Sequence, residues 1–411
     1  MMSFLPLYID PGTGSMLFSL FIGIAAVLTY GIKTLILRFK FIFSGGKTDL
    51  CADNKNIPFV IFSDHKRYWN VFKPICDEFE KRKINLVYYT ASSDDPVFNE
   101  SYKYVTSSFL GDKNKPYAKL NFLHADILLS TTPGLNVYQW KKSRYVKYYV
   151  HIPHSVSDLL GYRMFGIDHY DSILASGYNQ LLHLRELEKK RPSIKEKEFT
   201  VVGSTYLDSM YSRLGSFESK SKNQKKVVLI APSWGKSSIL SKYGTKFFDI
   251  LSKTDFEIIV RPHPQSIVSE QKILKPLIEK YPNFLWNFDN DNFDVLNKAD
   301  VLISDFSGVI FDFALVFDKP IIYTDTNFDK SPYDIDWLDE DLWELQILSK
   351  LGNKLTEENF SSLQKLILES IESLDLQKSR LSIRDEAWAN RGRAASSVVD
   401  YLILKQKELI K

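Results

Sequence analysis

Residues 301–312 read VLISDFSGVIFD, and this stretch carries the clearest structural signal in the chain. Its first three side chains form an unbroken apolar run, which is typical of a strand buried on both faces of a parallel sheet. Small and polar residues from Ser304 onward end the strand, and a helix is predicted to begin near Ser307 or Gly308. The stretch therefore predicts a strand, a short loop and a helix, the repeating unit of a doubly wound α/β fold.

The same alternation of apolar runs and helical patterns continues on both sides of this stretch. Strands are predicted at 59–62, 86–89, 127–129, 145–150, 173–175, 199–202, 227–230, 256–260, 284–286, 301–303 and 321–323, with helices at 265–280 and 309–317 among those between them. A polar segment rich in Ser and Lys, 212–226, divides the series into two halves. We therefore expect two doubly wound, Rossmann-like domains facing a cleft, 57–220 and 226–375, followed by a helical tail over 376–411.

Composition narrows the possible classes of function. The 411 residues are 44% hydrophobic and 25% charged, so a globular rather than a disordered chain is expected. Lys and Arg number 53 and Asp and Glu 50, and this near balance predicts no nucleic-acid partner. The two cysteines, Cys51 and Cys76, form no disulfide framework, which favours a reducing compartment. We see no metal-binding motif and expect no cofactor.

The amino terminus departs from the globular pattern. Residues 16–32 form an uncharged, mainly apolar run, and a helix over 15–37 is long enough to cross a bilayer if Lys33 reaches the headgroups. Basic residues follow the run, whereas Asp10 is the only charge before it, so the positive-inside rule puts the remaining chain in the cytoplasm. We expect an N-terminal transmembrane helix, residues 1–40, anchoring a cell-membrane protein with cytoplasmic domains; a monotopic hairpin or a buried helix is the alternative.

Ligands of open parallel sheets bind beyond the carboxyl ends of the strands, and the informative residues lie there. Ser304, Ser307 and Gly308 follow the strand at 301–303, where free backbone N–H groups at a helix start suit a phosphate. Asp305 belongs to the same loop, and Asp312 is expected one turn into the helix, facing the ligand or positioning the loop. An ordinary Ser/Asp helix cap is the alternative interpretation.

A second constellation, Arg261-Pro262-His263-Pro264, follows the strand at 256–260. Two prolines fix the backbone around His263, a group that titrates near neutral pH. Arg261 is of the type that pairs with phosphate through two hydrogen bonds. We expect both side chains to face the ligand.

The first half offers a histidine pair, His151 and His154, after the strand at 145–150. The pair has no neighbouring ligand set for zinc, so a general base facing the cleft is the better interpretation. His154 is favoured because it lies between Pro153 and Ser155, whereas His151 is expected to be packed.

Two weaker elements complete the set. Residues 231–235, Ala-Pro-Ser-Trp-Gly, follow the strand at 227–230 and place Ser233 and Trp234 near the expected ligand. Residues 203–208, Gly-Ser-Thr-Tyr-Leu-Asp, lie near the domain junction. Each by itself is no stronger than a turn.

Together these elements resemble the CDP-glycerol glycerophosphotransferase family, which includes teichoic acid primases and polymerases. Residues 261–264 are similar to its Arg-x-His-Pro motif, and 304–312 to its Ser/Thr-Asp-Tyr-Ser-Ser…Asp motif, with Phe306 for Tyr and Gly308 for Ser. Residues 231–234 resemble its Ala-Pro-Thr-Trp element. Residues 203–208 resemble its Gly-x-Pro-Arg-x-Asp, without the Pro and Arg. A late segment is similar to its Asp-Gly-x-Ala: Asn390-Arg391-Gly392-Arg393-Ala394.

The resemblance implies a glycosyltransferase-B-like fold and transfer of glycerol phosphate, or a similar polyol phosphate, from a CDP-alcohol to an acceptor hydroxyl in cell-surface polymer synthesis. It casts His154 as base and His263 as acid or as stabiliser of the leaving phosphate. Arg261, Ser304 and Ser307 would hold the diphosphate. At His154 the chain departs from the family's Trp-His-Gly-Thr-Pro. The resemblance therefore implies a lipid-linked or polymeric acceptor without fixing its identity. A nucleotide-sugar transferase of the same fold and a non-catalytic nucleotide-binding membrane scaffold are the alternatives.

Overall fold

The computed structural model describes residues 56–411, apart from 138, 164, 215–224, 290, 325–329, 332, 334 and 336, together with Ile22, Ile24, Ala25, Leu28, Thr29, Gly31 and Ile32. The run predicted as an anchor, 16–32, therefore lies largely outside the described residues. Among those that are described, no helix has the length and apolar character needed to cross a membrane. The chain divides into two compact units, 1–55 and 56–411, and the architecture below is that of the second.

The first half of this unit is built on a parallel sheet. Its strands are β1 (Ile57–Ser63), β2 (Leu86–Thr90), β3 (Val105–Phe109), β4 (Ala125–Ser130), β5 (Val146–His151), β6 (Ser172–Ala175) and β7 (Glu198–Val201). Within the described residues they lie in the order β3-β2-β1-β4-β5-β6-β7, each pair parallel. The chain reverses its winding direction between β1 and β4, so the carboxyl ends of these two strands form a topological switch point.

The second half repeats the design. Its strands are β8 (Val227–Ile230), β9 (Glu257–Val260), β10 (Leu285–Trp286), β11 (Val301–Ser304), β12 (Ile321–Thr324) and β13 (Gly352–Leu355). In the described part of the chain their order is β10-β9-β8-β11-β12-β13, again parallel throughout. Here the switch point lies between β8 and β11. The prediction of two doubly wound domains is confirmed.

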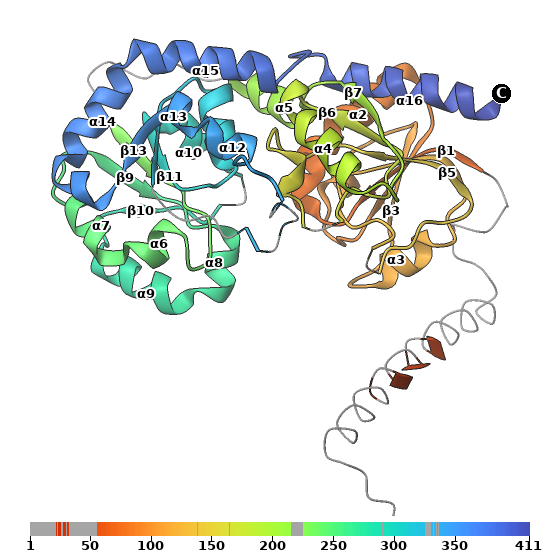
Figure 1. The fold of residues 1–411 in the computed structure, drawn as a ribbon, viewed down its shortest axis with the longest axis horizontal. Helices are drawn as coiled ribbons and strands as arrows, with labels where there is room; N and C mark the ends of the chain where they lie inside the picture. Colours follow the sequence, from red (N-terminus) through yellow and green to blue (C-terminus); the bar gives the residue numbers. More distant parts are fainter. Residues whose placement is uncertain are drawn as a thin grey trace, which may run out of the picture. The chain divides into compact units, whose positions relative to one another are not determined.

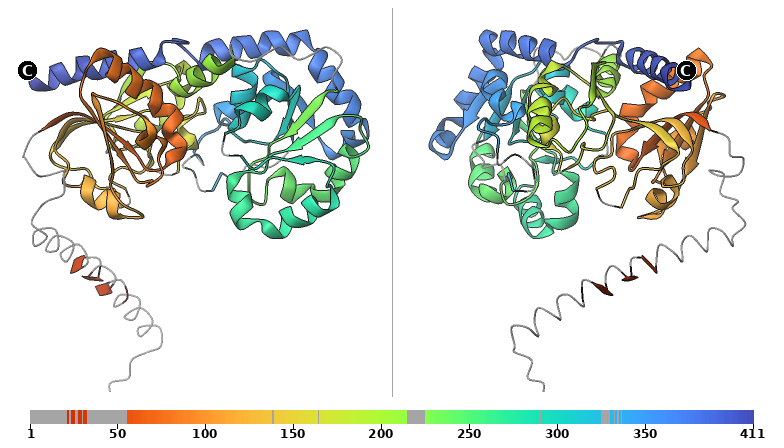
Figure 2. Two further views of the ribbon diagram at one scale, coloured as in Figure 1. Left: turned by 180° about the vertical axis from the view of Figure 1, so that it is seen from behind. Right: turned by 45° about the vertical axis from the view of Figure 1, so that its right-hand side comes forward.

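Helices and short helical turns connect the strands of both domains (Figures 1 and 2). Around the first sheet lie η1 (Lys66–Tyr68), α2 (Trp69–Arg82), η2 (Pro96–Asn99), α3 (Lys115–Leu120), η3 (Leu159–Gly161), η4 (Tyr178–Gln180), α4 (Leu182–Lys190) and α5 (Thr205–Leu214). Around the second lie α6 (Ile239–Lys242), α7 (Gly244–Leu251), α8 (Pro264–Ser269), α9 (Gln271–Lys280), α10 (Phe293–Lys298), α11 (Val309–Phe311), η5 (Asp312–Val316), α12 (Trp343–Gln346), α13 (Leu348–Leu351), η6 (Glu357–Ser362) and α14 (Leu363–Glu372).

Two strands escape the sequence prediction, and both are edge strands. β3 reads VTSSF and β13 reads GNKL. An edge strand has a partner on one side only, so neither carries the unbroken apolar run that identifies a central strand. The predicted helix at 265–280 is interrupted at Glu270 between α8 and α9, and the one at 309–317 changes from α11 to the π-helical turn η5 at Asp312.

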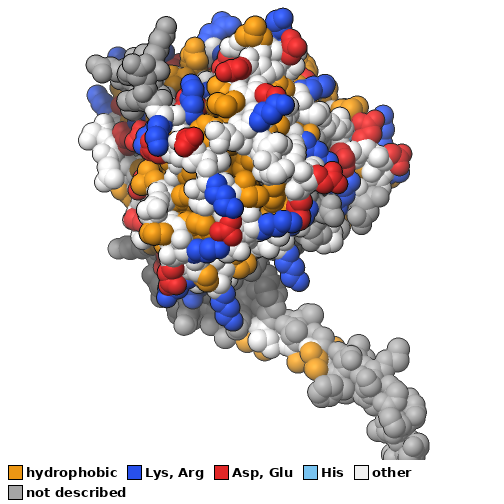
Figure 3. All heavy atoms as spheres, turned by 90° about the vertical axis from the view of Figure 1, so that its left-hand side faces the viewer, with side chains coloured by type: hydrophobic (Ala, Val, Ile, Leu, Met, Phe, Trp, Pro, Cys, Tyr) orange, Lys and Arg blue, Asp and Glu red, His pale blue; other side chains and the backbone are white. Residues whose placement is uncertain are grey.

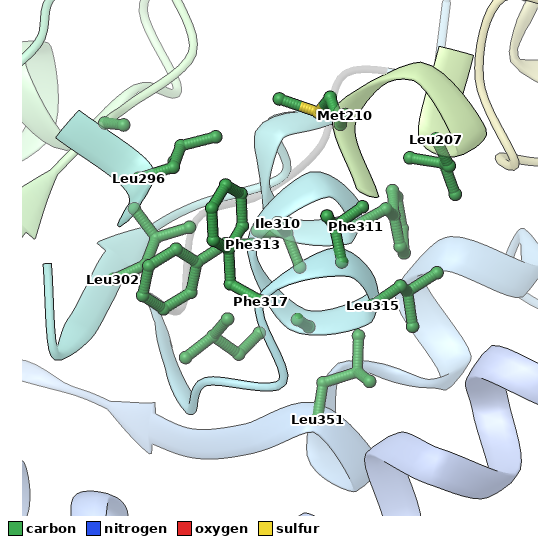
Figure 4. Packing of buried hydrophobic residues seen from close by; sticks show 14 of the residues in the cluster. Leu207, Met210, Leu296, Leu302, Ile310, Phe311, Phe313, Leu315, Phe317 and Leu351 are labelled. Carbon is green, nitrogen blue, oxygen red and sulfur yellow. The ribbon is translucent and has the colours of Figure 1, made fainter. Parts of the chain in front are cut away.

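The second sheet is buried on both faces. Val227 and Leu229 point into one apolar cluster, whereas the alternate residues Val228 and Ile230 point into the other. This alternation follows from the two-residue period of a strand. Figure 4 shows the first cluster, in which Phe313 and its neighbours on the 309–317 helix pack between Leu302 of β11 and the side chains of α5.

On its outer face, the second domain carries mixed charge. In Figure 3, Lys and Arg side chains alternate with Asp and Glu over this face, with apolar side chains between them. Among the side chains coloured there, no patch of a single sign stands out. A strong attraction for polyanions at this face therefore has no basis in its charge pattern.

The chain finally returns from the second domain to the first. α15 (Leu374–Ala387) lies over the second domain and α16 (Ala394–Ile410) over the first (Figure 1). Val398, Val399 and Leu402 of α16 are buried in the core of the first sheet, beside α2. The segment expected as a helical tail, 376–411, thus contributes to the core of the N-terminal domain.

A single carboxylate fixes the point of return. Asp208 on α5 accepts hydrogen bonds from Trp388 Nε1 at 2.8 Å, Gly392 N at 2.9 Å and Ala394 N at 3.0 Å. At Gly203, where φ is +95°, an added Cβ would lie 2.3 Å from the carbonyl oxygen of Ala389. The two motif segments 203–208 and 390–394 are therefore in direct contact, and we call this contact the Asp208 clasp.

We predict that Asp208→Ala destabilises the protein by about 3 kcal/mol, because it leaves several donors without their acceptor. Urea unfolding measures the loss. Asp400→Ala on α16 is the matched control: Asp400 is two-thirds exposed and pairs with Arg82, so about 1 kcal/mol or less is expected there. Equal destabilisation by the two variants would show that the clasp has no special role.

Candidate functional site

A cavity of about 480 Å³ lies between the two sheets, within the volume range of small-molecule sites. Residues of the first domain, including Arg67, His154 and Tyr162, line one side of it. Gly308 and Asp312 line it from the second domain. Arg67 follows β1 and Gly308 follows β11, so each sheet contributes its own topological switch point. The predicted cleft thus exists as a defined pocket.

His154 faces this cavity, as the sequence predicted. Its Nδ1 lies 3.3 Å from Thr131 Oγ1 and 3.4 Å from the Tyr162 hydroxyl, and its ring packs against Tyr68 with centroids 5.0 Å apart. Burial, reinforced by the positive charge of Arg67, lowers the pKa of His154 to about 4. The ring is therefore neutral at pH 7. Among the described residues both hydrogen-bond contacts of the ring are at Nδ1, which leaves Nε2 to a ligand.

His151 is packed inside the domain, also as expected. Its side chain is fully buried, with its ring against Tyr162 and Tyr170 at centroid separations of 5.2 and 4.8 Å. Neither ring nitrogen has a hydrogen-bond partner within the described part of the chain. Burial lowers the pKa of His151 to about 3, with the neighbouring His154 adding to the shift. His151 is absent from the cavity lining.

His263 is held rigidly but does not line the cavity. It is the N-cap of α8, where its Nδ1 accepts a hydrogen bond from Gln265 N at 3.1 Å. Because Nδ1 is an acceptor, the neutral ring carries its proton on Nε2 and donates from there. Burial, followed by the charge of Arg67, lowers the pKa of His263. The charge of Arg67 thus contributes to the lowered pKa of both histidine rings.

Arg261 has a different setting from the one predicted for a diphosphate ligand. Its guanidinium donates to Asn287 Oδ1 and, at 2.7 Å, to the backbone oxygen of Asp289. It is absent from the cavity lining. These bonds link the end of β9 to the segment that follows β10, so Arg261 positions a loop of the second domain in this structure.

The polar side chains at the end of β11 also form hydrogen bonds within the second domain. Ser304 is fully buried and its hydroxyl donates to Ala231 O at 2.7 Å. Asp305 is 1% exposed and accepts from the backbone N–H groups of Ser233, Ile239 and Phe306 at 2.9, 3.1 and 2.8 Å. Burial raises the pKa of Asp305, and these hydrogen bonds oppose the shift. Ser304 and Asp305 therefore lock the loop after β8 to the loop after β11.

Ser307 and Gly308, further along that loop, are more accessible than Ser304 and Asp305. Ser307 is half-buried, and Gly308 is exposed at the cavity. A Cβ added to Gly308 would meet no atom within 4 Å, so the missing side chain leaves open space rather than relieving a clash. Beyond the end of β8, Trp234 is 48% exposed and its ring lies 6.4 Å from that of His263, tilted by 30°. Trp234 and His263 thus form an accessible aromatic surface.

Asp312 lines the cavity from the π-helical turn η5. Its Oδ2 accepts from the Tyr206 hydroxyl at 3.0 Å and from Asn292 Nδ2 at 3.4 Å. Burial raises the pKa of Asp312 to about 7, although both hydrogen bonds oppose the shift. Since Tyr206 belongs to α5 and to the 203–208 segment, this bond ties that segment to the helix after β11.

A further acidic group escaped the sequence analysis. Glu344 of α12 lines the cavity, and its Oε2 accepts from the backbone N–H of Asp158 at 2.9 Å. The Asp158 carboxylate in turn pairs with His183, and this contact raises the pKa of His183. Burial, followed by the charge of Asp158, raises the pKa of Glu344 to about 8. No motif surrounds Glu344, so the sequence carried no signal for it.

Arg67 also escaped the analysis, although a signal existed. It lies on η1, directly after β1, and its guanidinium stacks over the Tyr68 ring at 5.2 Å. A rule that inspects the residues after every predicted strand includes this position. Within the described residues, no group of three or more His, Cys, Asp or Glu side chains is arranged to hold a metal ion.

The groups at the ends of the strands suit proton transfer and anion binding. A neutral imidazole faces the cavity from one domain, a donating imidazole lies beyond a strand of the other, and one guanidinium acts on both. Such groups suit phosphoryl transfer, in which positioning and charge stabilisation supply most of the catalysis.

Comparison with known sequences agrees with the motifs. Residues 195–338 match the family model described as CDP-Glycerol:Poly(glycerophosphate) glycerophosphotransferase. The teichoic acid glycerol-phosphate primase of Bacillus spizizenii is 30% identical over 152 residues, which are 34% of this chain and 37% of that protein. The chain thus spans little more than a third of the curated relative. The predicted resemblance to this family is confirmed.

Solved structures of similar fold extend over nearly the whole chain. The wall teichoic acid polymerase TagF superposes with a TM-score of 0.55 at 16% identity, covering 93% of this chain and 99% of that one. The UDP-GlcNAc 2-epimerase of Neisseria meningitidis gives 0.54 at 12% identity, covering 85% and 100%. Identities this low show the fold alone. The α/β, glycosyltransferase-B-like fold predicted from the sequence is confirmed.

We predict that Asp312→Asn stabilises the protein at pH 8 but not near pH 4. The folded-state pKa of about 7 exceeds the ordinary value of 3.8, so the unfolded chain loses this proton first as pH rises. Stability therefore falls between about pH 4 and 7, by at most about 4 kcal/mol, and an amide avoids the loss.

Urea unfolding at pH 5 and pH 8 measures this difference. Asp255→Asn, on the exposed turn before β9, is the control, for which a pH-independent change within about 0.5 kcal/mol is expected. An Asp312→Asn variant no more stable than the parent at pH 8 would contradict the raised pKa of Asp312.

Proposed function

We propose that this chain, similar to the CDP-glycerol glycerophosphotransferases over its second domain, transfers glycerol phosphate or a similar polyol phosphate from a CDP-alcohol to an acceptor hydroxyl. Such a reaction belongs to the synthesis of cell-surface polymers. The observation that carries the proposal is His154, a neutral imidazole facing the interdomain cavity with Nε2 directed to a ligand. The family match at 195–338 supplies the donor class.

The proposed chemistry is one displacement at phosphorus. Nε2 of His154 accepts the proton of the acceptor hydroxyl, whose oxygen attacks the phosphorus that carries the polyol. The new O–P bond forms as the bond from that phosphorus to the bridging oxygen breaks, and CMP leaves with the bonding electrons. His263 donates from Nε2–H to the phosphate oxygens during this step, since its Nδ1 is occupied by Gln265 N. Thr131, as acceptor from Nδ1–H, would keep His154 in the basic tautomer.

The donor in this proposal lies against the second domain. Ser307 and Gly308 border the diphosphate, with the exposed Trp234 beside the nucleoside. Ser304, Asp305 and Arg261 act on the donor through the loops that they hold. Preorganised loops cost no reorganisation when charge develops in the transition state.

We predict that His154→Ala and His263→Ala each lower transfer by a hundredfold to ten-thousandfold, the usual contribution of proton-transfer groups. His154→Ala should leave CDP binding nearly unchanged, whereas His263→Ala should weaken it modestly. CMP release and product formation, measured together with CDP binding by calorimetry, check both expectations. Donor choice follows from the same assay run with CDP-glycerol, CDP-ribitol and UDP-sugars.

His151→Gln is the internal control, since His151 is packed away from the cavity. A folded His151→Gln protein should retain most of its turnover. If it loses activity while His154→Ala keeps it, the base is misassigned. If the parent protein binds CDP but turns over no donor, the scaffold alternative replaces the enzymatic one.

We further propose that residues 1–40 anchor the protein in the cell membrane with both sheets in the cytoplasm. The apolar run at 16–32 and the basic residues after it support this proposal. Deletion of 1–40 should release a soluble protein, and a reporter fused at Lys411 should be cytoplasmic. Partition of the truncated form into membranes at the full-length level would contradict a single anchor.

A further inference from the structure

We propose that the segment 155–158, which follows His154, is an interdomain latch whose contacts with the second domain hold the proposed base in place. Val156 and Glu344 are its positioning residues. This inference rests on the proposed function and concerns how that same site is assembled. Three observations carry it: the Val156 side chain, the Asp158 backbone and the support behind the segment all lead to the second domain.

Val156 packs into the apolar cluster on one face of the second sheet. Its side chain is 2% exposed, although it lies two residues from a histidine of the cavity. Most of the other buried members of that cluster belong to the second domain, among them Leu229 of β8, Leu302 of β11 and Trp343 of α12. Separation of the domains would return apolar surface of this kind to water. Burial of Val156 therefore favours the latch in its present place.

The end of the latch is bound by α12. The backbone N–H of Asp158 donates to Glu344 Oε2 at 2.9 Å, and the backbone N–H of Trp343 reaches Asp158 Oδ2 at 3.5 Å. Within the first domain, the Asp158 carboxylate accepts from Leu160 N at 2.9 Å and pairs with His183 of α4. Asp158 thus joins α12 of the second domain to two elements of the first.

Behind the latch, two buried amide side chains of η4 bond to its carbonyl groups. Gln180 Nε2 donates to Ser155 O at 3.1 Å and to Ser157 O at 2.8 Å. Asn179 Nδ2 donates to Val156 O at 2.8 Å. Three successive carbonyl groups are therefore fixed, and a stretch bonded in this way moves together with η4 rather than bending at one residue.

The second domain in turn holds η4 through α15. Ser176, two residues before η4, accepts a hydrogen bond at its backbone oxygen from Ala389 N at 2.9 Å, just past the end of α15. An added Cβ at Gly177 would lie 2.2 Å from the backbone oxygen of Glu386, so the two segments are in close contact. Trp343 Nε1 donates to Glu386 Oε1 at 3.0 Å, which ties α12 to α15. Both supports of the latch therefore depend on helices of the second domain.

The side-chain contacts of His154 are too long to fix the ring by themselves. Its Nδ1 lies 3.3 Å from Thr131 Oγ1 and 3.4 Å from the Tyr162 hydroxyl, beyond the usual range of about 2.7–3.2 Å. The backbone therefore decides where Nε2 is directed, and that backbone continues into the latch. Because a misplacement of about 1 Å can cost about a hundredfold in rate, contact between the domains sets the efficiency of the base.

The test observes the His154 ring in the full chain, held in detergent and labelled with 13C-histidine, with the signal assigned by its loss in His154→Ala. Between pH 5 and pH 8 the parent's ring should stay neutral, because burial lowers the pKa of His154 to about 4. Val156→Ala and Glu344→Ala should admit solvent to the ring. The pKa of His154 should then rise toward its ordinary value of 6.5, and the ring should take up a proton within that pH range.

Kinetics give a second measurement. Both variants should lower kcat for transfer by about tenfold to a hundredfold, because the base is displaced, and leave the Kd for CDP unchanged. Glu344→Gln keeps an acceptor for the Asp158 N–H. It also resembles the protonated carboxyl expected at pH 7, because burial raises the pKa of Glu344 to about 8. Glu344→Gln should therefore restore most of what Glu344→Ala loses.

Val295→Ala is the matched control. Val295 of α10 is 8% exposed, belongs to the same apolar cluster as Val156 and does not line the cavity. The same truncation should weaken the protein toward urea while the His154 titration and kcat stay at the parent's values. Unfolding curves show that each variant is folded. If Val156→Ala does not fold, the Glu344 pair of variants carries the test.

The titration and the turnover separate this inference from the proposed function. If the parent turns over no donor, the proposed function fails, whereas a raised His154 pKa in Val156→Ala and Glu344→Ala still supports the latch. If both variants keep the parent's titration and kcat, or if Val295→Ala changes them equally, the latch is overturned. An equal loss of kcat in Glu344→Ala and Glu344→Gln, with the His154 titration unchanged, overturns the positioning role of Glu344.

Discussion

The arrangement of the two domains depends on the clasp at Asp208. Its carboxylate receives the Trp388 indole and two backbone N–H groups at the place where the chain leaves α15 and enters α16. α16 completes the core of the first sheet, so the carboxyl end of the chain is bound into the amino-terminal domain. Tyr206, two residues before Asp208, holds Asp312 at the cavity. The contact that closes the fold therefore also sets the position of a cavity group.

Much of the architecture was predictable because the central strands of a parallel sheet are unbroken runs of apolar residues. β8 reads VVLI, its alternate residues enter opposite clusters, and its bounds agree with prediction. β3 and β13 carry no such signal, because an edge strand tolerates polar residues. The packing of α16 against the first domain could not be predicted either. An apolar helix face indicates that the helix is buried, but it does not indicate which sheet the helix packs against.

The site was predictable in place but not in orientation. His154, Gly308 and Asp312, which follow predicted strands, line the cavity, and the roles assigned to them stay predictions. Yet a motif does not reveal whether a side chain faces a ligand or a neighbouring loop, and both the Ser304 hydroxyl and the Asp305 carboxylate turned toward the loop after β8. Arg67 has no motif around it and was missed, although it follows a predicted strand; the sheet order then identifies the end of β1 as a switch point.

These orientations divide the work between the domains. In the second domain, the Ser304 hydroxyl and the Asp305 carboxylate are engaged by the loop after β8, and such bonds hold the two loops in place before any ligand arrives. In the first domain, the groups at the strand ends keep an open edge: Nε2 of His154 and the guanidinium of Arg67. Rigid loops suit a diphosphate that must be held in one geometry, since a misplaced phosphorus forfeits much of the rate. Side chains with an unoccupied hydrogen-bonding edge suit the proposed acceptor, which binds, gives up a proton and leaves with one more polyol phosphate attached. Under the proposed function, this asymmetry between two otherwise similar sheets would correspond to the difference between the two reactants.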